Sequence, residues 1–194
     1  MTDQTIPHEG PNKDDAPASS SLKGDPAAAI GAPEGSSVSG RAVTINKPVA
    51  EVYAYFRDFS RLPSFMENVE RIEVADARRS HWVVKAPGGK TVEWDAVVTE
   101  EQENAVIAWK AENADVPNSG RVEFRDAGAR GTVVTATIAY APPAGTIGKL
   151  VAKMFQREPA IQARRDLRRF KQLMETGEIA TPAMNKQQFE EMGL

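Results

Sequence analysis

Residues 48–59 read PVAEVYAYFRDF, and the fold prediction starts from this stretch. Proline suits the first turn of a helix, because the N–H that it lacks would have no helical partner there. Apolar side chains then recur with the spacing i, i+3, i+4 and i+7, at Val49, Val52, Tyr53 and Phe56. This spacing predicts a helix with one apolar face. Residues 58–63 interrupt the pattern, and we expect residues 64–68 to form one further short helical turn.

Strand-like segments surround this helix. One segment before it and six after it have the alternating or β-branched pattern of strands. They are residues 41–45, 69–75, 80–86, 91–99, 105–111, 120–126 and 132–140. The links between them are short and contain turn residues, as in Pro87-Gly88-Gly89 and residues 127–131. Short links favour antiparallel pairing, so we expect a seven-stranded antiparallel sheet.

The last predicted element is a long C-terminal helix, from about Thr146 to Thr176, with Gly177 as its stop residue. Pro159 predicts a kink or two abutting helices. The charged side of its second half is basic, with Arg164, Arg165, Arg168, Arg169 and Lys171. The element order predicts an α+β fold in which a curved sheet wraps around this helix. Where the two layers do not fully interdigitate, a cavity for a small molecule is expected.

Composition excludes several classes of function. The 194 residues include 24 Lys and Arg against 27 Asp and Glu, which gives a net charge of −3 and disfavours a nucleic-acid-binding role. The sequence has no Cys, and its only histidines are His8 and His81. Thiolate and multi-histidine metal sites are therefore excluded, and we expect neither a metal nor another cofactor.

Two tails flank the predicted domain of residues 38–177. Residues 1–37 are acidic, lack aromatic side chains and are rich in Pro, Ser and Ala, so we expect them to be disordered. Residues 178–194 are expected to form a flexible C-terminal tail. Residues 131–148 carry no charge, but their threonines and a Pro-Pro pair predict a strand and a turn rather than a membrane helix. Without a targeting signal, the cytoplasm is the expected location.

Several segments resemble a known superfamily. They are residues 48–59 with the following Leu62-Pro63, residues 80–86, 92–96 and 119–124, the exit 140–143, and residues 166–171. The likeness is to the START-like, or polyketide cyclase/dehydrase and lipid-transport, superfamily. Within it, the chain is most similar to small bacterial proteins labelled cyclase/dehydrase, which also resemble the coenzyme Q-binding branch. The resemblance implies a helix-grip fold, with two short helices after the first strand, around a hydrophobic pocket. It implies no single chemistry, because no catalytic motif is shared across the superfamily.

Candidate ligand-binding residues are those expected to face the cavity from the strands and the long helix. They are Trp82, Val84, Trp94, Ala96, Trp109, Phe124, Tyr140 and Met154. The indoles offer a stacking wall for a flat or prenylated ligand, and plain core packing is the alternative for each of them. Tyr140 either hydrogen-bonds a ligand carbonyl at the mouth of the cavity or caps the core.

The polar candidates are expected outside. Alternation places His81 on the face opposite Trp82, so a catalytic role is disfavoured. Glu93 and Asp95 share one face, where a solvated pair is favoured over an acid–base pair. Arg41, Arg121 and Arg125 either hold an anionic group at the rim of the pocket or keep the surface soluble. No residue is assigned a catalytic role.

Three functions remain open. The first is binding of a hydrophobic small molecule (a lipid, a quinone or a polyketide-like compound) in the cavity. The second is a cyclase/dehydrase enzyme, which needs at least one titratable group inside the cavity. The third is an interaction or stress-response protein with a vestigial cavity. Contact between the basic helix face and a membrane surface is a weaker expectation than simple solvent exposure, and the sequence does not define an oligomeric state.

Overall fold

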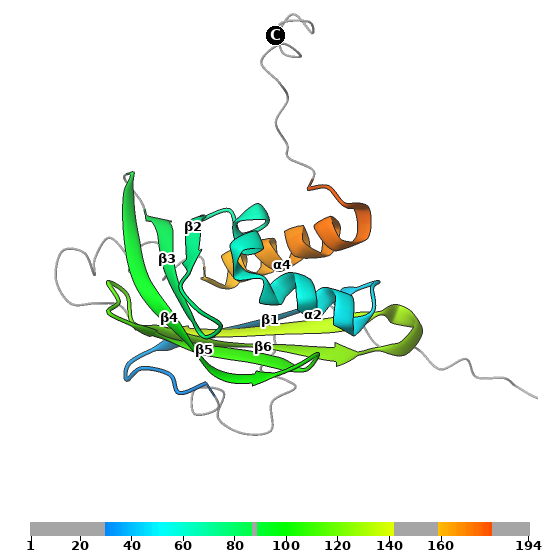
Figure 1. Ribbon diagram of the computed structural model, residues 1–194, viewed down its shortest axis with the longest axis horizontal. Helices are drawn as coiled ribbons and strands as arrows, with labels where there is room; N and C mark the ends of the chain where they lie inside the picture. The colour runs from blue at the N-terminus through cyan, green and yellow to red at the C-terminus, as the bar shows by residue number, and fades with distance from the viewer. Residues whose placement is uncertain (1–29, 87–88, 142–158, 180–194) are drawn as a thin grey trace, which may run out of the picture.

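A computed structural model of the protein describes residues 30–86, 89–141 and 159–179. The described elements are β1 (Ser37–Ile45), α2 (Val49–Arg57), η3 (Phe59–Ser64), β2 (Val69–Val74), β3 (Arg79–Ala86), β4 (Lys90–Gln102), β5 (Val106–Glu112), β6 (Asn118–Asp126), η4 (Gly128–Arg130), β7 (Thr132–Tyr140) and α4 (Pro159–Thr176). The α+β, helix-grip prediction is confirmed: one sheet curves around the C-terminal helix, and α2 and α4 lie on the same side of it (Figure 1).

The sheet has seven strands in the order β1-β7-β6-β5-β4-β3-β2, and every neighbouring pair is antiparallel. β1 and β2 are therefore close in the chain but form the two opposite edges. The register places Trp82 opposite Trp94 and Trp109 opposite Gly120. The pairing of β4 with β5 shifts between Val98 and Glu100, an irregularity of the kind that bends a strand and increases its local twist.

The second short helix differs from the prediction. A 3₁₀ helix, η3, occupies Phe59–Ser64, the segment expected to end the helical region, rather than residues 64–68. A 3₁₀ helix has three residues per turn, so Phe59 and Leu62 project from the same side, and both are buried. Pro63 lies inside this 3₁₀ helix rather than ending the helical region before it.

An aromatic core joins the helices to the sheet. The rings of Phe65 and Phe170 are stacked, with centroids 4.6 Å apart. Phe56 of α2 contacts both rings and also Phe124 of β6, all at centroid distances near those of favourable aromatic pairs. Phe170 of α4 is fully buried. This cluster fixes one half of α4 against the sheet and leaves space beside its other half.

The end of α4 is as expected, because Gly177 has a φ of 78° and closes the helix by donating its N–H to the Leu173 carbonyl. Other expectations lie outside the described residues. These are most of the N-terminal tail, the C-terminal residues from 180 onward, the helix before Pro159 with its kink, and Met154.

Candidate ligand-binding site

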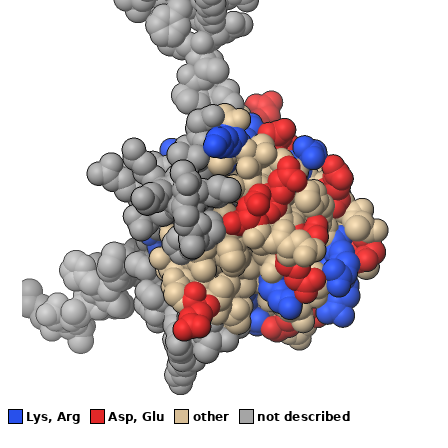
Figure 2. Space-filling model, turned by 90° about the vertical axis from the view of Figure 1, so that its left-hand side faces the viewer, with Lys and Arg blue, Asp and Glu red and all other residues tan. Residues whose placement is uncertain are grey.

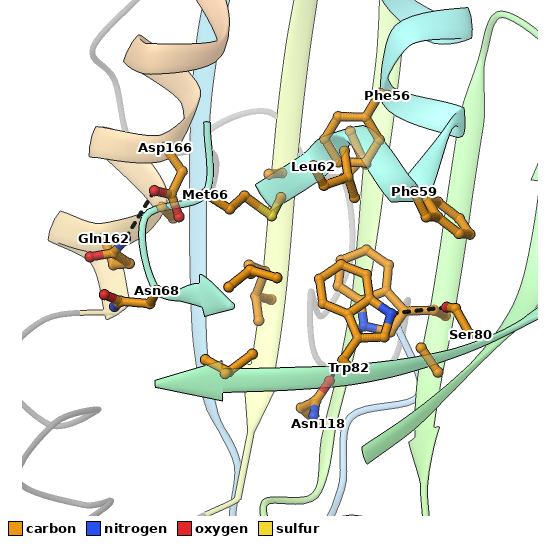
Figure 3. A pocket seen from close by; sticks show the side chains of 18 of the residues that line it. Phe56, Phe59, Leu62, Met66, Asn68, Ser80, Trp82, Asn118, Gln162 and Asp166 are labelled. Atoms are coloured by element: carbon orange, nitrogen blue, oxygen red, sulfur yellow. Dashed lines mark hydrogen bonds between the residues drawn. The ribbon is translucent and has the colours of Figure 1, made fainter. Parts of the chain in front are cut away.

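A cavity of about 200 Å³ lies between the concave face of the sheet, η3 and α4 (Figure 3). Its walls are almost entirely apolar and include the three tryptophans of the chain, Trp82, Trp94 and Trp109. They come from β3, β4 and β5, because every second residue of a strand points to the same face. Phe59, Leu62 and Met66 close the cavity from the side of η3.

Most of the candidate ligand-binding residues line this cavity. They are Trp82, Val84, Trp94, Ala96, Trp109 and Tyr140. Phe124 is buried on the same side of the sheet, but it packs against Tyr53 and Phe56 of α2 and does not reach the lining. Met154 lies outside the described residues.

The indoles of Trp82 and Trp94 form a stacked pair, with ring centroids 6.0 Å apart and an interplanar angle of 15°. Trp82 donates its indole N–H to Ser80 Oγ at 2.9 Å. The buried indole N–H of Trp94, in contrast, has no hydrogen-bond acceptor among the residues that the structure describes. An unsatisfied donor beside a cavity is a group that an acceptor on a ligand can satisfy.

The opposite side of the cavity is polar. Asp166 and Gln162 of α4 and Asn68, which precedes β2, lie together there, across the cavity from Trp82 (Figure 3). Gln162 Nε2 donates to Asp166 Oδ1 at 2.9 Å. Burial raises the pKa of the Asp166 carboxyl to about 6, against the opposing effects of Gln162, the backbone N–H of Glu67 and Arg169. The cavity therefore contains a carboxyl group that titrates near neutral pH.

The sequence analysis did not single out Asp166, because it described the charged side of this helix by its basic residues. The signal was present in the apolar spacing of α4. Ala163, Leu167 and Phe170 are buried, and Asp166 falls between them at the i+3 position counted from Ala163. An acidic side chain inside an apolar stripe is a candidate for a functional site, because burying a carboxylate is costly.

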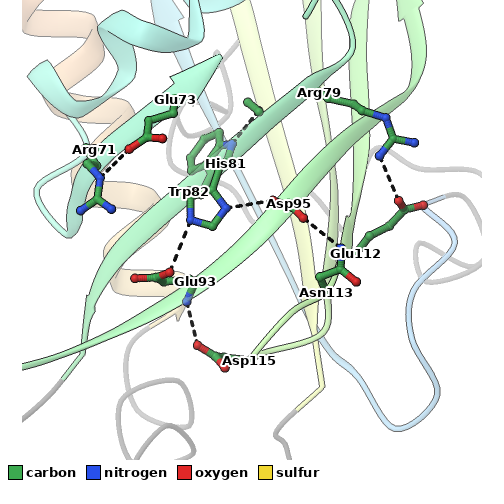
Figure 4. Close-up of polar contacts among 11 residues, drawn as sticks. Arg71, Glu73, Arg79, His81, Trp82, Glu93, Asp95, Glu112, Asn113 and Asp115 are labelled. Carbon is green, nitrogen blue, oxygen red and sulfur yellow. Dashed lines mark hydrogen bonds and ion pairs between the residues drawn. The ribbon is translucent and has the colours of Figure 1, made fainter. Parts of the chain in front are cut away.

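The remaining polar candidates lie on the outer face of the sheet. His81 stands between two carboxylates, with Nδ1 2.8 Å from Asp95 Oδ1 and Nε2 3.4 Å from Glu93 Oε2 (Figure 4). Hydrogen bonding to Asp95 is the main reason that the pKa of His81 is raised above 6.5. The pKa of Asp95 is lowered, first by the Asn113 amide and then by His81. Glu93 and Asp95 do share a face, and the sequence did not show that His81 joins them across the strand pair.

The strand arginines do not line the cavity. Arg121 pairs with Glu100 and Glu123, and its hydrogen bond to Glu100 raises its pKa further. Arg41 donates to the Gly40 carbonyl, and Arg125 is exposed. Basic and acidic side chains alternate on the face that Figure 2 presents, rather than forming a patch of one sign.

The basic face of α4 is largely paired within the protein. Arg165 lies 3.4 Å from Glu67, Arg169 donates to the Phe65 carbonyl at 3.0 Å, and Lys171 lies 2.9 Å from Glu175. The first two contacts tie α4 to the segment after η3, and the third ties it to its own last turn.

The family model for polyketide cyclase/dehydrase and lipid transport matches residues 38–175. The chain belongs to this family. A Streptomyces lincolnensis relative, an uncharacterized 17.2 kDa protein encoded in the melC2-rnhH intergenic region, is 30% identical over 69% of this chain and 86% of its own length. The family match therefore runs from the second residue of β1 to the residue before the end of α4.

Solved structures agree with this assignment. Protein DR_A0006 from Deinococcus radiodurans is 40% identical, with a TM-score of 0.60 over 73% of this chain and 99% of that one. Protein TTHA0849 from Thermus thermophilus is 26% identical, with a TM-score of 0.59 over 72% of this chain and 96% of that one. The Zhui aromatase/cyclase from Streptomyces sp. R1128 is 14% identical, with a TM-score of 0.59 over 75% of this chain and 99% of that one. At this low identity, the likeness shows a shared fold alone.

Two other kinds of feature are absent from the described part of the chain. No helix there is both long and apolar enough to cross a bilayer. No group of three or more His, Asp or Glu side chains there is arranged to hold a metal ion. The apolar cavity with its single carboxyl group is therefore the candidate site that the family fold offers in these residues.

Proposed function

We propose that this protein binds a hydrophobic small molecule, of lipid, quinone or polyketide type, in the cavity between the sheet and α4. The observation that carries the proposal is the cavity itself: about 200 Å³ remain open inside a lining of aromatic and aliphatic side chains. Close packing is the rule in protein interiors, and apolar voids of this size attract apolar ligands.

The size of the cavity limits the ligand. Ligand pockets commonly measure about 300–1,000 Å³, so this cavity fits a compact, flat molecule or one end of a longer one. The stacked indoles of Trp82 and Trp94 give such a molecule a flat apolar surface. Burying it there is favourable by about 25 cal/mol for each Å² of apolar surface removed from water.

Catalysis of a cyclase/dehydrase type is the weaker proposal. Removal of water from a bound chain needs a positioned acid and a positioned base. Among the described residues that line the cavity, Asp166 is the only carboxylic acid, and there is no Lys, Arg or His. His81, Glu93 and Asp95, which could have formed an acid–base set, lie on the other face of the sheet.

The test uses 1-naphthalenemethanol, a flat, neutral and mostly apolar probe, with isothermal titration calorimetry on the full chain. We expect one molecule to bind per chain. Ala96→Leu fills the cavity from its wall and should abolish binding, whereas Ala54→Leu, on the exposed side of α2, should not change it. Absence of binding, or equal binding by the Ala96→Leu variant, would contradict the proposal.

A further inference from the structure

The lone carboxyl group in an otherwise apolar cavity restricts what the cavity accepts. We propose that the site selects ligands that carry a protonated amine, with the ammonium group on Asp166 and the flat apolar body against Trp82 and Trp94. This inference rests on the proposed function, because it names the chemical class of ligand for the same cavity.

The geometry at the polar end suits an ammonium group. Asp166, Gln162 and Asn68 lie together on one side of the cavity and each carries a side-chain oxygen (Figure 3). Gln162 uses its amide N–H to bond Asp166, so its carbonyl oxygen is directed elsewhere and can accept a further hydrogen bond. An alkylammonium group has three N–H donors and no acceptor, which matches a group of oxygen acceptors.

The charge balance favours a cation in the same place. No basic side chain is found among the described residues of the lining. The charged side chains that act on the Asp166 carboxyl are Arg169 and Glu67. Arg169 donates to the Phe65 carbonyl and lies 4.0 Å from Glu67, and Arg165 also contacts Glu67. These two cations are thus directed toward Glu67. Arg169 lowers the pKa of Asp166 from a distance, but no cation forms an ion pair with Asp166 among the described residues.

Other classes of ligand fit less well. A fatty acid or another carboxylate would place a second negative charge beside Asp166 in a poorly solvated site, which is unfavourable. A neutral alcohol can donate one hydrogen bond to Asp166, but it does not neutralise the carboxylate. An ammonium group adds the attraction between opposite charges, which is stronger in a poorly solvated site than in water, so the amine is favoured over the alcohol.

The experiment compares three probes with the same body: 1-naphthylmethylamine, 1-naphthalenemethanol and 1-naphthoate. At pH 7.5, we expect the amine to bind at least about tenfold more tightly than the alcohol, and the carboxylate to bind most weakly. Because the carboxyl of Asp166 has a pKa of about 6, the preference for the amine should shrink as the pH falls below 6.

Two variants assign the effect to the carboxyl group. Asp166→Asn should bind the amine and the alcohol equally, while Glu70→Gln, which removes an exposed carboxylate outside the lining and leaves the ion pairs of Glu67 intact, should keep the preference. Thermal unfolding of both variants checks that they fold.

The outcomes separate this inference from the proposed function. If the alcohol binds and the amine binds no more tightly, the inference is overturned and the cavity-binding function stands. If Glu70→Gln loses the preference as completely as Asp166→Asn does, the inference is also overturned. If neither the alcohol nor the amine binds, both proposals are wrong.

Discussion

The indole of Trp109 covers Gly120, the residue directly opposite it on the adjacent strand, so closely that a Cβ atom at position 120 would overlap the ring. Glycine is therefore required here for space and not for an unusual backbone angle. The contact holds Trp109 flat against β6, where it forms part of the cavity wall, and Trp109 also donates its indole N–H to Asn118 at 3.3 Å.

Gly120→Ala should push the Trp109 ring from its position. We expect a loss of about 1–3 kcal/mol in the free energy of unfolding, as for other overpacked cores, together with weaker binding of 1-naphthalenemethanol. Ser119→Ala is the control, because it changes the adjacent residue on the opposite face of β6, where the buried hydroxyl has no partner among the described residues. If Gly120→Ala matches the wild type in both chemical denaturation and probe binding, the packing of Trp109 against Gly120 contributes neither to stability nor to the shape of the cavity.

The two stacked indoles should respond differently to loss of their N–H groups. Trp94→Phe removes a buried donor that has no partner among the described residues, so the stability should change by less than about 1 kcal/mol after the smaller ring is accommodated. Trp82→Phe breaks the hydrogen bond to Ser80 and should cost about 1–3 kcal/mol. Urea denaturation of both variants gives the comparison. A larger cost for Trp94→Phe than for Trp82→Phe would show that the Trp94 N–H is bonded in solution.

Asp166→Asn should stabilise the protein at neutral pH. The pKa of Asp166 is about 6 in the folded state and 3.8 as its reference value, so the folded state binds the proton more tightly than the unfolded state does. The contribution of this group to stability therefore decreases as the pH rises from 3.8 to 6, and its full cost is present above 6. We expect the variant to be more stable than the wild type by on the order of 2 kcal/mol at pH 7.5 and nearly equal to it below pH 4. Denaturation curves at several pH values test this; a gain that does not depend on pH would contradict it.

The stabilisation that the His81 cluster gives the protein should also decrease as the pH rises. Here the cause is the loss of a proton from His81. The pKa of His81 is raised above 6.5, so its contribution to stability is fully present below 6.5 and is lost as the pH rises through the folded-state value. In an NMR titration, Asp95→Asn should lower the pKa of His81 more than Glu93→Gln does, because the Asp95 hydrogen bond is the main cause of the shift. Equal effects of the two variants would assign the shift to general negative charge rather than to that bond.

Strand alternation predicted which residues face the cavity and which face the outer side of the sheet. It placed Trp82 and Trp94 inward and His81 outward, because neighbouring residues on a strand face opposite sides whatever the rest of the fold is. Phe124 shows where this reasoning stops. It faces the concave side, as alternation requires, but α2 covers it with Tyr53 and Phe56. Periodicity within a strand does not say which part of a sheet a helix will cover.

Asp166 shows a second limit. A count of charges along α4 indicated a basic surface face, whereas the buried positions Ala163 and Leu167 set the rotation of the helix and turn Asp166 inward. The pairing of His81 with Glu93 and Asp95 was missed for a related reason. Their proximity depends on the register between β3 and β4, which pairs His81 with Asp95 and is set by contacts across strands rather than by either strand alone.

The strand order also determines when a newly synthesised chain can form the cavity. Val43 of β1 pairs with Val134 of β7, so the first strand to leave the ribosome has no neighbour until the last strand has been translated. Contacts between such distant parts of a chain form slowly. The cavity is complete only when α4 packs against the sheet, and α4 follows every strand in the sequence. The complete cavity can therefore form only after the whole domain has been translated.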